Sequence, residues 1–299
     1  MEYIVGRKNI KLKNTVITLG KFDGLHIGHQ LLIDENKRSK DKGLKSVVFT
    51  FLQSENGKYI YTEDEKRELL ERIGIDVCVL FPFDNDIKNI SAKSFIKDIL
   101  IEKLDAKKIV VGSDFRFGKD RIGDGELLKE LSSVYGYEVV IFDKKKNSYG
   151  EEISSNMIRN LILESNMEKV TECLGRPYSI SGIVNKGRQL GRTIGFPTIN
   201  IIPEKSKILP LNGVYSSDIV FYDDKNKVVY RGITNVGNNP TVADGLEKTI
   251  ETNIFDFDRD VYGKKVVVYL KKYIRGERKF SGLYELKENI ERDKREAML

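Results

Sequence analysis

A chain of 299 residues with 40% hydrophobic and 32% charged side chains is long enough for two domains and too apolar to stay disordered. Its sequence shows no 18-residue apolar run and no N-terminal signal peptide, and its two cysteines are too few for a disulfide framework or a cysteine-rich zinc site. We therefore expect a cytoplasmic protein with two buried thiols and no membrane partner.

The first half of the sequence alternates between strand and helix patterns. Short β-branched runs predict buried strands, and segments with helical spacing follow them. The expected strands are 15–19, 44–51, 75–83, 107–115 and 137–143, and the expected helices are 28–43, 63–74, 91–104 and 125–136. Strands that alternate with helices predict an α/β fold with a doubly wound, Rossmann-like parallel sheet.

The strand–helix alternation runs to about residue 143, and the pattern changes from Gly175 onward. One or two helices are expected over 153–175, and short strands separated by Gly, Asn and Pro turns follow. The expected strands are 178–184, 213–222, 227–236, 249–257 and 264–274, and an amphipathic helix over 283–298 follows them. This half predicts a small antiparallel β-barrel or sandwich with a terminal helix. We place the boundary near Gly175–Pro177, which gives domains of residues 1–175 and 176–299.

Charge is divided unevenly between these halves. Residues 1–175 carry no net charge, and residues 176–299 carry the whole formal charge of +6, much of it within Lys271–Lys279. Such a patch is typical of proteins that bind nucleic acid, but it also suits an anionic small ligand or a solvated face. The basic segment has few interleaved aromatic residues and the chain has no Trp, so we expect no nucleic-acid partner.

Both histidines of the chain lie in one short segment just after the first expected strand. Gly20 and Gly24 allow the backbone to turn tightly there, and the following helix start offers free N–H groups and a positive dipole end. His26 and His29 lie one helical turn apart, so both can donate hydrogen bonds to the same anion. Packed histidines, a zinc site that includes Asp23, and phosphate binding are the three interpretations that the residue types allow.

The segment GKFDGLHIGH, residues 20–29, resembles the G-x-F-D-x-x-H-x-G-H signature of the HxGH nucleotidyltransferases. The resemblance implies that His26 and His29 contact nucleotide phosphates and stabilise the transition state as pyrophosphate leaves. It also implies contacts between ATP and the rest of the turn, namely Gly20, Phe22, Asp23 and Gly24. The signature alone leaves several acceptors open, among them glycerol phosphate, phosphopantetheine and a nicotinate nucleotide.

Two later segments support a nucleotide site. VVGSDFRFG places Asp114 in a loop after a strand, where it is expected near ATP. ISSNMIR places Ser154 and Ser155 at a helix start with Arg159 farther along, and it resembles the ISSTxIR element of the same family, which binds ATP phosphates. Without that resemblance it is an ordinary helix cap. The chain has no GxxxxGK[ST] loop and no third histidine, which excludes a P-loop and a Ser-His-Asp or Cys-His site elsewhere.

A second glycine-rich segment, GIVNKGRQLGRTIGFPTINI, spans residues 182–201. Its glycines can let backbone N–H groups wrap an anion and its cations can neutralise that anion, although the same pattern also suits a flexible hairpin. The glycines are Gly187, Gly191 and Gly195, and the cations are Lys186, Arg188 and Arg192. Thr198 and Asn200 are two residues apart, so on a strand they share a face, and their oxygens suit magnesium.

GFPTIN resembles the G-x-PTAN motif of the riboflavin kinase family, with Ile199 in place of the usual Ala. Later segments, among them GITNVGNNPTV, ETNIFDFDRDVYG and RGERKFSGLYELKENI, follow in the family's order and spacing. The resemblance implies that Thr198 and Asn200 hold Mg²⁺ and ATP phosphates and that Glu251 is the general base. Asn253 stands where the family often has His, so a role for that His does not carry over.

An HxGH domain followed by a riboflavin kinase domain resembles the bacterial family of bifunctional riboflavin kinases and FAD synthetases. The resemblance implies ATP, riboflavin and FMN as substrates, Mg²⁺ as the companion of ATP, FMN and FAD as products rather than prosthetic groups, and flavoenzymes as downstream recipients. Phe115 and Arg275 are then expected to contact flavin. The segment 52–61, LQSENGKYIY, departs from the Pro-containing loop that is common in the family, and we expect it to alter FMN affinity or the adenylylation rate.

Two other functions remain open from the sequence. A flavin-binding or regulatory protein can keep the fold and lose one reaction, and a cytidylyltransferase uses CTP in place of ATP. Incubation with riboflavin, ATP and magnesium separates these cases, because only the bifunctional enzyme makes both FMN and FAD.

Overall fold

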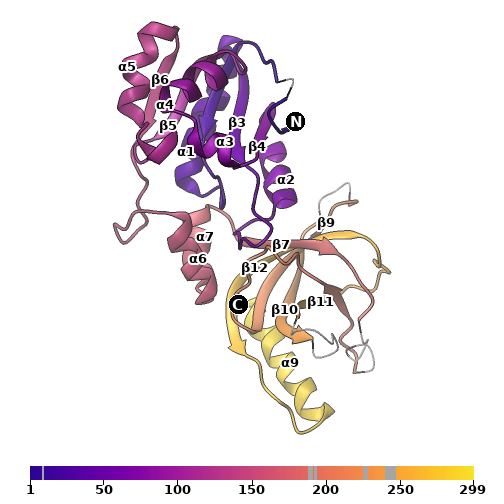
Figure 1. The fold of residues 1–299 in the computed structure, drawn as a ribbon. Coiled ribbons are helices and arrows are strands. Elements are labelled where there is room, and N and C mark those ends of the chain that lie inside the picture. The colour runs from indigo at the N-terminus through magenta and orange to yellow at the C-terminus, as the bar shows by residue number, and fades with distance from the viewer. Residues whose placement is uncertain (9, 188–190, 192–193, 225–227, 240–246) are drawn as a thin grey trace. The chain divides into compact units, whose positions relative to one another are not determined.

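The computed structural model describes residues 1–8, 10–187, 191, 194–224, 228–239 and 247–299. By their internal contacts these residues form two compact units (Figure 1). The first unit comprises Met1–Gly57 and Tyr61–Ser155, and the second comprises Lys58–Ile60 and Asn156–Leu299. The chain therefore crosses between the units three times, and the last crossing comes two helices before the domain boundary expected from the sequence.

The first unit is built on a sheet of six parallel strands in the order β1-β4-β3-β2-β5-β6. The strands are β1 (Glu2–Val5), β2 (Thr15–Leu19), β3 (Lys45–Phe51), β4 (Val77–Phe81), β5 (Ala106–Gly112) and β6 (Glu138–Phe142). The predicted parallel α/β sheet is confirmed. The sequence does not predict β1, because its four edge residues carry no alternation of their own and form a strand only by pairing with β4.

Helices connect these strands. They are α1 (Ile27–Arg38), α2 (Glu63–Ile73), α3 (Asn85–Asn89), α4 (Ala92–Ser94) with a π-helical continuation over Phe95–Ile101, and α5 (Gly125–Tyr135). Thr62 and Glu65 form a capping box at the start of α2, and Gly74 ends that helix in the left-handed conformation. The expected helices are confirmed, and the one over 91–104 is partly π-helical.

Both faces of the parallel sheet are covered. β2 and β4 are buried at every position, and alternate residues enter two apolar clusters, with Ile17 and Val47 in one and Val16 and Val48 in the other. A strand that is buried on both faces has a continuous run of apolar residues in its sequence, and this pattern made these strands predictable. Both cysteines are buried free thiols, as expected, and burial raises the pKa of Cys78 to about 12.

The second unit is built on a six-stranded antiparallel sheet in the order β7-β12-β9-β10-β11-β8. The strands are β7 (Tyr178–Ile183), β8 (Thr198–Ile201), β9 (Gly213–Phe221), β10 (Tyr230–Asn239), β11 (Glu247–Ile254) and β12 (Lys265–Gly276). β7 and β8, the two ends of this order, approach each other at Gly182, where a Cβ would overlap the Ile201 side chain. The sheet therefore curls into a partial barrel, which agrees with the predicted barrel.

Helix α7 (Met167–Leu174) packs against β7 and β12, and α6 (Ser155–Leu163) belongs to the same unit from Asn156 onward. Ser165, between them, lies 2.7 Å from the Tyr215 hydroxyl and accepts a hydrogen bond from the Leu211 N–H at 3.0 Å. Burial raises the pKa of Tyr215 to about 12, so its phenol stays protonated and donates to the Leu211 carbonyl. The segment that leads out of the first unit is thus held by the second.

The atypical segment 52–61 also reaches the second unit. Its residues Lys58–Ile60 belong to that unit by their contacts, and Tyr59 forms a parallel bridge with Lys207. The buried Lys207 ammonium donates a hydrogen bond to the Ile60 carbonyl at 2.8 Å. The expected effect of this segment on FMN affinity stays a prediction.

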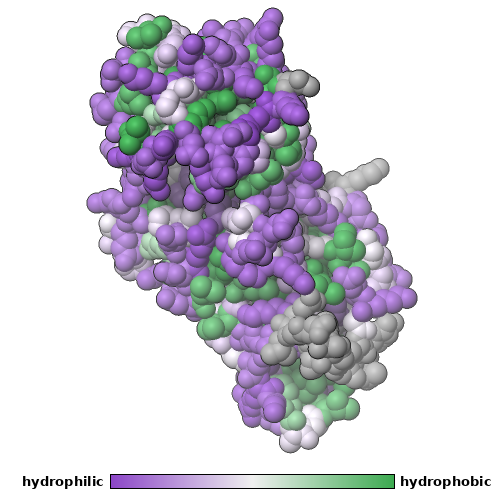
Figure 2. All heavy atoms as spheres, in the orientation of Figure 1, coloured by the Kyte–Doolittle hydropathy of each residue, from purple (hydrophilic) through white to green (hydrophobic). Residues whose placement is uncertain are grey.

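The terminal helix α9 (Leu283–Met298), yellow in Figure 1, packs against β9, β10 and β12. Its Ile290 and Ala297 lie on the apolar cluster of Val214, Ile233 and Phe255. Hydrophilic side chains cover most of the visible face of the protein (Figure 2). Among the helices that the structure describes, none is both long and apolar enough to cross a membrane.

A nearly buried ion pair ties α1 to the first sheet and generates a stability prediction. Lys108 of β5 donates to Glu35 of α1 at 2.6 Å, and the more exposed Glu138 lies 3.2 Å away. The hydrogen bond from Lys108 lowers the pKa of Glu35 below its usual value of 4.5. The pair therefore stabilises the folded state fully above pH 4.5, and this stabilisation is lost as the pH falls through the lowered pKa. Glu35→Gln should lower the free energy of unfolding by about 1–3 kcal/mol at pH 7.

Urea titrations followed by circular dichroism at pH 7 and at pH 3 measure this effect. Glu138→Gln is the matched control, and it should lower the free energy of unfolding by less, because Glu138 is half exposed. The interpretation is wrong if both variants lose equal stability, or if the Glu35→Gln deficit is as large at pH 3 as at pH 7.

Candidate functional site

The first candidate site lies where the strand order of the parallel sheet reverses. β2 pairs with β3 on one side and with β5 on the other, so the chain winds away from β2 in both directions. In open parallel sheets, ligands bind outside the carboxyl ends of two such strands. The turn of residues 20–26 follows β2 and the loop of residues 113–118 follows β5, so two of the predicted phosphate segments share one edge of the sheet.

The turn before α1 is held in an uncommon backbone conformation. Phe22 and Leu25 are left-handed, with φ of 49° and 45°, and both side chains are fully buried. We expected glycines to supply the tight turn, yet neither Gly20 nor Gly24 has a positive φ. Gly20 serves a different purpose, because a Cβ there would lie 3.2 Å from the Phe22 ring.

The two histidines stack on each other at the start of α1. His26 is the N-cap, and its Nδ1 accepts a hydrogen bond from the N–H of His29 at 3.3 Å. The ring centroids are 3.6 Å apart with an angle of 22° between the planes. Gly28 permits this stack, since a Cβ there would lie 3.2 Å from the His26 ring. Because Nδ1 accepts, a neutral His26 carries its proton on Nε2, where it can donate to an anion.

This geometry disfavours the zinc interpretation. Nδ1 of His26 is already engaged as a helix cap. In the described part of the chain, no group of three or more His, Cys, Asp or Glu side chains could hold a metal ion. Asp23, the carboxylate of the zinc interpretation, is buried within the turn. The arrangement suits an anion better than a metal.

Lysines after β6 contribute positive charge that sequence reasoning missed. Lys144 lies 3.0 Å from Glu152 and 3.3 Å from the predicted ATP ligand Asp114, and these carboxylates, Glu152 foremost, raise the pKa of the ammonium. The Lys145 Cβ lies 3.8 Å from the position that a Cβ on Gly28 would take. The run DKKK at 143–146 was the only signal, and it carries no motif.

A chain of phenylalanines links the ends of β4 and β5. Neighbouring rings have centroids 5.0–5.7 Å apart. In order, the rings are Phe83, Phe51, Phe49, Phe95, Phe117 and Phe115. Phe83 is 56% exposed although it is large and apolar. The predicted flavin contact Phe115 is therefore one end of a chain of rings whose middle members, Phe49, Phe95 and Phe117, are buried in the core.

The third predicted phosphate segment is divided between the units. Ser154 and Ser155 end the first unit, and Ser155 begins α6 as expected. Arg159 belongs to the second unit, and its guanidinium donates to Asn156 at 3.0 Å. The phosphate roles of these residues stay predictions.

The second candidate site is organised by strand register in the antiparallel sheet. Asn200 on β8 lies directly opposite Glu251 on β11, and Thr198 lies opposite Asn253 two residues away. Residues two apart on a strand share a face, so all four side chains are on one face of the sheet, as expected for Thr198 and Asn200. Glu251 is exposed there.

The glycines of the second segment have separate structural roles. A Cβ on Gly187 would overlap the Asn200 carboxamide, a Cβ on Gly191 would overlap the Phe196 carbonyl, and Gly195 is left-handed with φ of 88°. Close approach, rather than free flexibility, therefore explains Gly187 and Gly191. The expected cations Arg188 and Arg192 lie outside the described residues.

Two further residues have structural partners. Asn253 donates to the Pro197 carbonyl at 2.8 Å, so it holds the loop that precedes Thr198. Arg275, which we expected at the flavin, forms a bidentate pair with Asp293 of α9 at 2.6–3.1 Å. This pair anchors the terminal helix, and a flavin contact by Arg275 stays a prediction.

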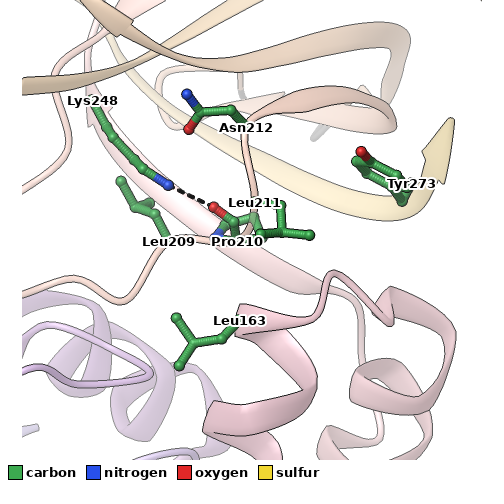
Figure 3. A pocket seen from close by; sticks show the side chains of 7 residues that line it. All are labelled: Leu163, Leu209, Pro210, Leu211, Asn212, Lys248 and Tyr273. Carbon is green, nitrogen blue, oxygen red and sulfur yellow. Dashed lines mark hydrogen bonds between the residues drawn. The ribbon is translucent and has the colours of Figure 1, made fainter. Parts of the chain in front are cut away.

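An apolar cavity of about 420 Å³ lies at one end of the barrel (Figure 3). Its lining residues are Leu163, Leu209, Pro210, Leu211, Asn212, Lys248 and Tyr273. Lys248 donates to the Pro210 carbonyl at 2.7 Å, and desolvation lowers the pKa of its ammonium. Asn212 donates to Glu277 at 3.0 Å. The Lys248 bond fixes the loop before β9.

Sequence comparison gives one family for each half of the chain. Residues 8–157 match the FAD synthetase family, and residues 174–299 match the riboflavin kinase family. The chain is 36% identical to a bifunctional riboflavin kinase/FMN adenylyltransferase of Buchnera aphidicola, over 98% of this chain and 96% of that protein. The chain belongs to the bifunctional riboflavin kinase/FMN adenylyltransferase family.

Other members of the bifunctional riboflavin kinase/FMN adenylyltransferase family are equally similar. The Bacillus subtilis protein is 36% identical over 95% of this chain and 92% of its own length, and the Escherichia coli K12 protein is 34% identical over 93% and 90%. A crystal structure from Streptococcus pneumoniae, described as a macrolide-efflux protein, is 32% identical with a TM-score of 0.87 over 100% of this chain and 99% of that one. The order of the two families agrees with the order of the two units.

The histidines give the first prediction for this family member. His26→Asn keeps a helix-capping side chain but removes the imidazole, and His29→Ala removes the second ring. Each variant should lose FAD formation by about 10²–10³-fold, as for loss of a transition-state donor, while FMN formation from riboflavin stays near the wild-type rate. Chromatographic separation of the flavins measures both. Equal loss of the two activities in a folded variant would contradict the assignment.

Gly187 gives a prediction for the riboflavin kinase half. Gly187→Ala should displace the Asn200 carboxamide and slow FMN formation by on the order of 10–10²-fold, because small displacements of positioning groups are costly. Gly282→Ala is the control, since a Cβ there meets nothing within 4 Å. FMN formation as fast in Gly187→Ala as in Gly282→Ala would show that this close approach does not matter.

Proposed function

We propose that the first unit transfers the adenylyl group of ATP to FMN at the turn of His26 and His29. A phosphate oxygen of FMN attacks the α-phosphorus of ATP, the bond from that phosphorus to its bridging oxygen breaks, and pyrophosphate leaves with the bonding electrons. The FMN phosphate is already anionic, so the step needs alignment and charge neutralisation rather than a strong base. Imidazole rings at the start of a helix, where the helix dipole is positive, support this role.

The other contacts of this site are assigned by resemblance. The proposed ATP contacts are Gly20, Phe22, Asp23, Gly24, Asp114, Ser154, Ser155 and Arg159. The Lys144–Asp114 pair supports a role near phosphate, because it holds an ammonium group at the same edge of the sheet. The aromatic chain that ends at Phe115 supports a flavin site, because flat rings stack on aromatic side chains.

The second unit phosphorylates riboflavin with a second ATP. Glu251 accepts the proton of the ribityl 5′-hydroxyl as its oxygen attacks the γ-phosphorus, and the bond from that phosphorus to the β–γ bridging oxygen breaks as ADP leaves. A neutral hydroxyl is a poor nucleophile, so a carboxylate base accelerates this step. The single observation that carries the proposal is the register that sets Glu251 directly opposite Asn200.

Thr198 and Asn200 fit a magnesium ion by the nature of their donors, a hydroxyl and an amide oxygen on one face. When bound, the ion offsets the negative charge of the ATP phosphates. Gly187, Gly191 and Gly195 shape the loop that leads to these residues, and the close approach of Gly187 to Asn200 supports a phosphate-binding loop at this point.

On this proposal the functional domains are residues 1–175 and 176–299, although α6 and α7 pack with the second unit. Mg²⁺ accompanies ATP, and FMN and FAD are products that flavoenzymes receive. A cytoplasmic location and the absence of a nucleic-acid partner are the remaining proposals. The two buried free thiols are compatible with a reducing compartment.

A protein that has lost adenylylation and retains the kinase is the second candidate. The departure of segment 52–61 from the common pattern favours testing it. Incubation with riboflavin, ATP and magnesium, followed by chromatography, decides between them. FMN and FAD together support the bifunctional enzyme, FMN alone supports the kinase, and neither product supports a flavin binder. CTP in place of ATP tests a cytidylyltransferase.

Glu251 gives the prediction for the kinase step. Glu251→Gln keeps the side-chain shape and removes the base, so FMN formation should fall by about 10²–10⁴-fold. FAD formation from supplied FMN should continue at the wild-type rate, and it serves as the internal control for folding. Kinase turnover at the wild-type rate in this variant would mean that Glu251 is not the base.

A further inference from the structure

Asn235 on β10 lies directly opposite Glu251, on the side away from Asn200. The three residues therefore form one row across β8, β11 and β10 with Glu251 in the middle. Directly opposite residues of antiparallel strands have Cα atoms about 4.5–5.5 Å apart, and their side chains lie on the same face. No motif in the sequence analysis singled out Asn235, because its relation to Glu251 arises only from strand pairing.

The surroundings of Asn235 leave its carboxamide available. The side chain is half-buried, and no residue in the described part of the chain forms a hydrogen bond with it. Next along the same face is Gly237, where a Cβ would crowd both the Asn235 amide nitrogen and the Glu277 carboxylate. On the other side, Val214 and Ile233 are covered by α9. Asn235 thus lies at the border between the apolar contact of α9 and the exposed Glu251.

We propose that Asn235 is a substrate-positioning residue of the kinase site, which hydrogen-bonds the secondary hydroxyls of the ribityl chain of riboflavin. The inference rests on the proposed role of Glu251 as the base. If the 5′-hydroxyl lies at Glu251, the rest of the ribityl chain must continue along the face to one side. Thr198 and Asn200 lie on the side of Glu251 that is proposed for ATP and Mg²⁺. The ribityl chain therefore lies on the other side of Glu251, where Asn235 is.

The chemistry of the carboxamide suits this ligand. A hydroxyl both donates and accepts hydrogen bonds, and an Asn side chain offers two N–H donors and a carbonyl acceptor. A carboxylate at this position would only accept and would place a second negative charge beside Glu251, and an apolar residue would leave the polyol without a partner. Asn235 does not titrate, so it orients the substrate and takes no part in proton transfer.

Substrate analogues test the contact directly. The 2′-, 3′- and 4′-deoxy analogues of riboflavin each lack one secondary hydroxyl and keep the 5′-hydroxyl that is phosphorylated. In the wild-type enzyme, the analogue that lacks the contacted hydroxyl should have kcat/KM reduced by about 3–10-fold, which corresponds to one lost neutral hydrogen bond. In Asn235→Ala, riboflavin itself should show that loss, and removal of the same hydroxyl should cause no further loss.

Three controls separate this role from a structural one. Asn238→Ala makes the same truncation at an exposed position on the same strand and should leave kinase kinetics unchanged. Asn235→Asp keeps the side-chain shape, and it should also raise KM for riboflavin because the carboxylate cannot donate. KM for ATP, and FAD formation from supplied FMN, should stay at wild-type values in every variant.

The outcomes are distinguishable. If all three deoxy analogues are penalised equally in wild type and in Asn235→Ala, or if KM for ATP rises together with KM for riboflavin, the positioning role is overturned while the kinase function stands. If the wild-type protein forms no FMN from riboflavin and ATP, the proposed function fails and the inference fails with it.

Discussion

A row of buried hydroxyl groups inside the barrel holds the register on which the kinase site depends. Thr234 of β10 donates to Ser217 of β9 at 2.8 Å and lies 2.9 Å from the hydroxyl of Thr252 on β11. Side chains alternate between the two faces of a strand, so a slip of one residue would turn Glu251 inward and Thr252 outward. Such a slip would also leave buried hydroxyls without partners, at a cost of about 1–3 kcal/mol each. The buried hydroxyl groups of Ser217, Thr234 and Thr252 therefore fix the register that aligns Glu251 with its neighbours on the opposite face.

The first site is held by a different constraint, the burial of a strained turn. Left-handed residues other than glycine cost on the order of 1–3 kcal/mol each, and this turn has two of them, Phe22 and Leu25. Burial of each apolar side chain contributes about 1.5–3 kcal/mol in return. The core thus offsets the strain, and the fold itself places His26 as the cap of α1. On the proposed mechanism, a donor pair held in this way needs little reorganisation when charge develops on the leaving group.

Features that depend on a local pattern could be predicted from the sequence, whereas features that depend on pairing between distant segments could not. The histidine turn, the shared face of Thr198 and Asn200, and the buried run of β2 follow from short patterns, and the structure agrees with their local geometry. The aromatic chain from Phe83 to Phe115 depends on the strand order of the sheet, which no single segment encodes.

The same limit applies to other parts of the chain. β1 forms only by pairing with the edge strand β4. Residues 58–60 belong to the second unit only through contacts such as the bridge between Tyr59 and Lys207. Local reasoning also gave the wrong reason for the glycine at position 20, since the turn needs room for the Phe22 ring rather than a flexible backbone.

On the proposed mechanism, the division of residue types between the two sites follows from the two nucleophiles: an anionic phosphate needs donors, and a neutral hydroxyl needs a base. The chain has no histidine after His29, and on the proposed mechanism the base of the second site is a carboxylate, which repels ATP. Glu251 lies between two neutral carboxamides, Asn200 and Asn235, so its two direct neighbours in the row across the sheet carry no charge. On the proposed mechanism, these neutral neighbours let one face of the sheet hold both a base and a triphosphate.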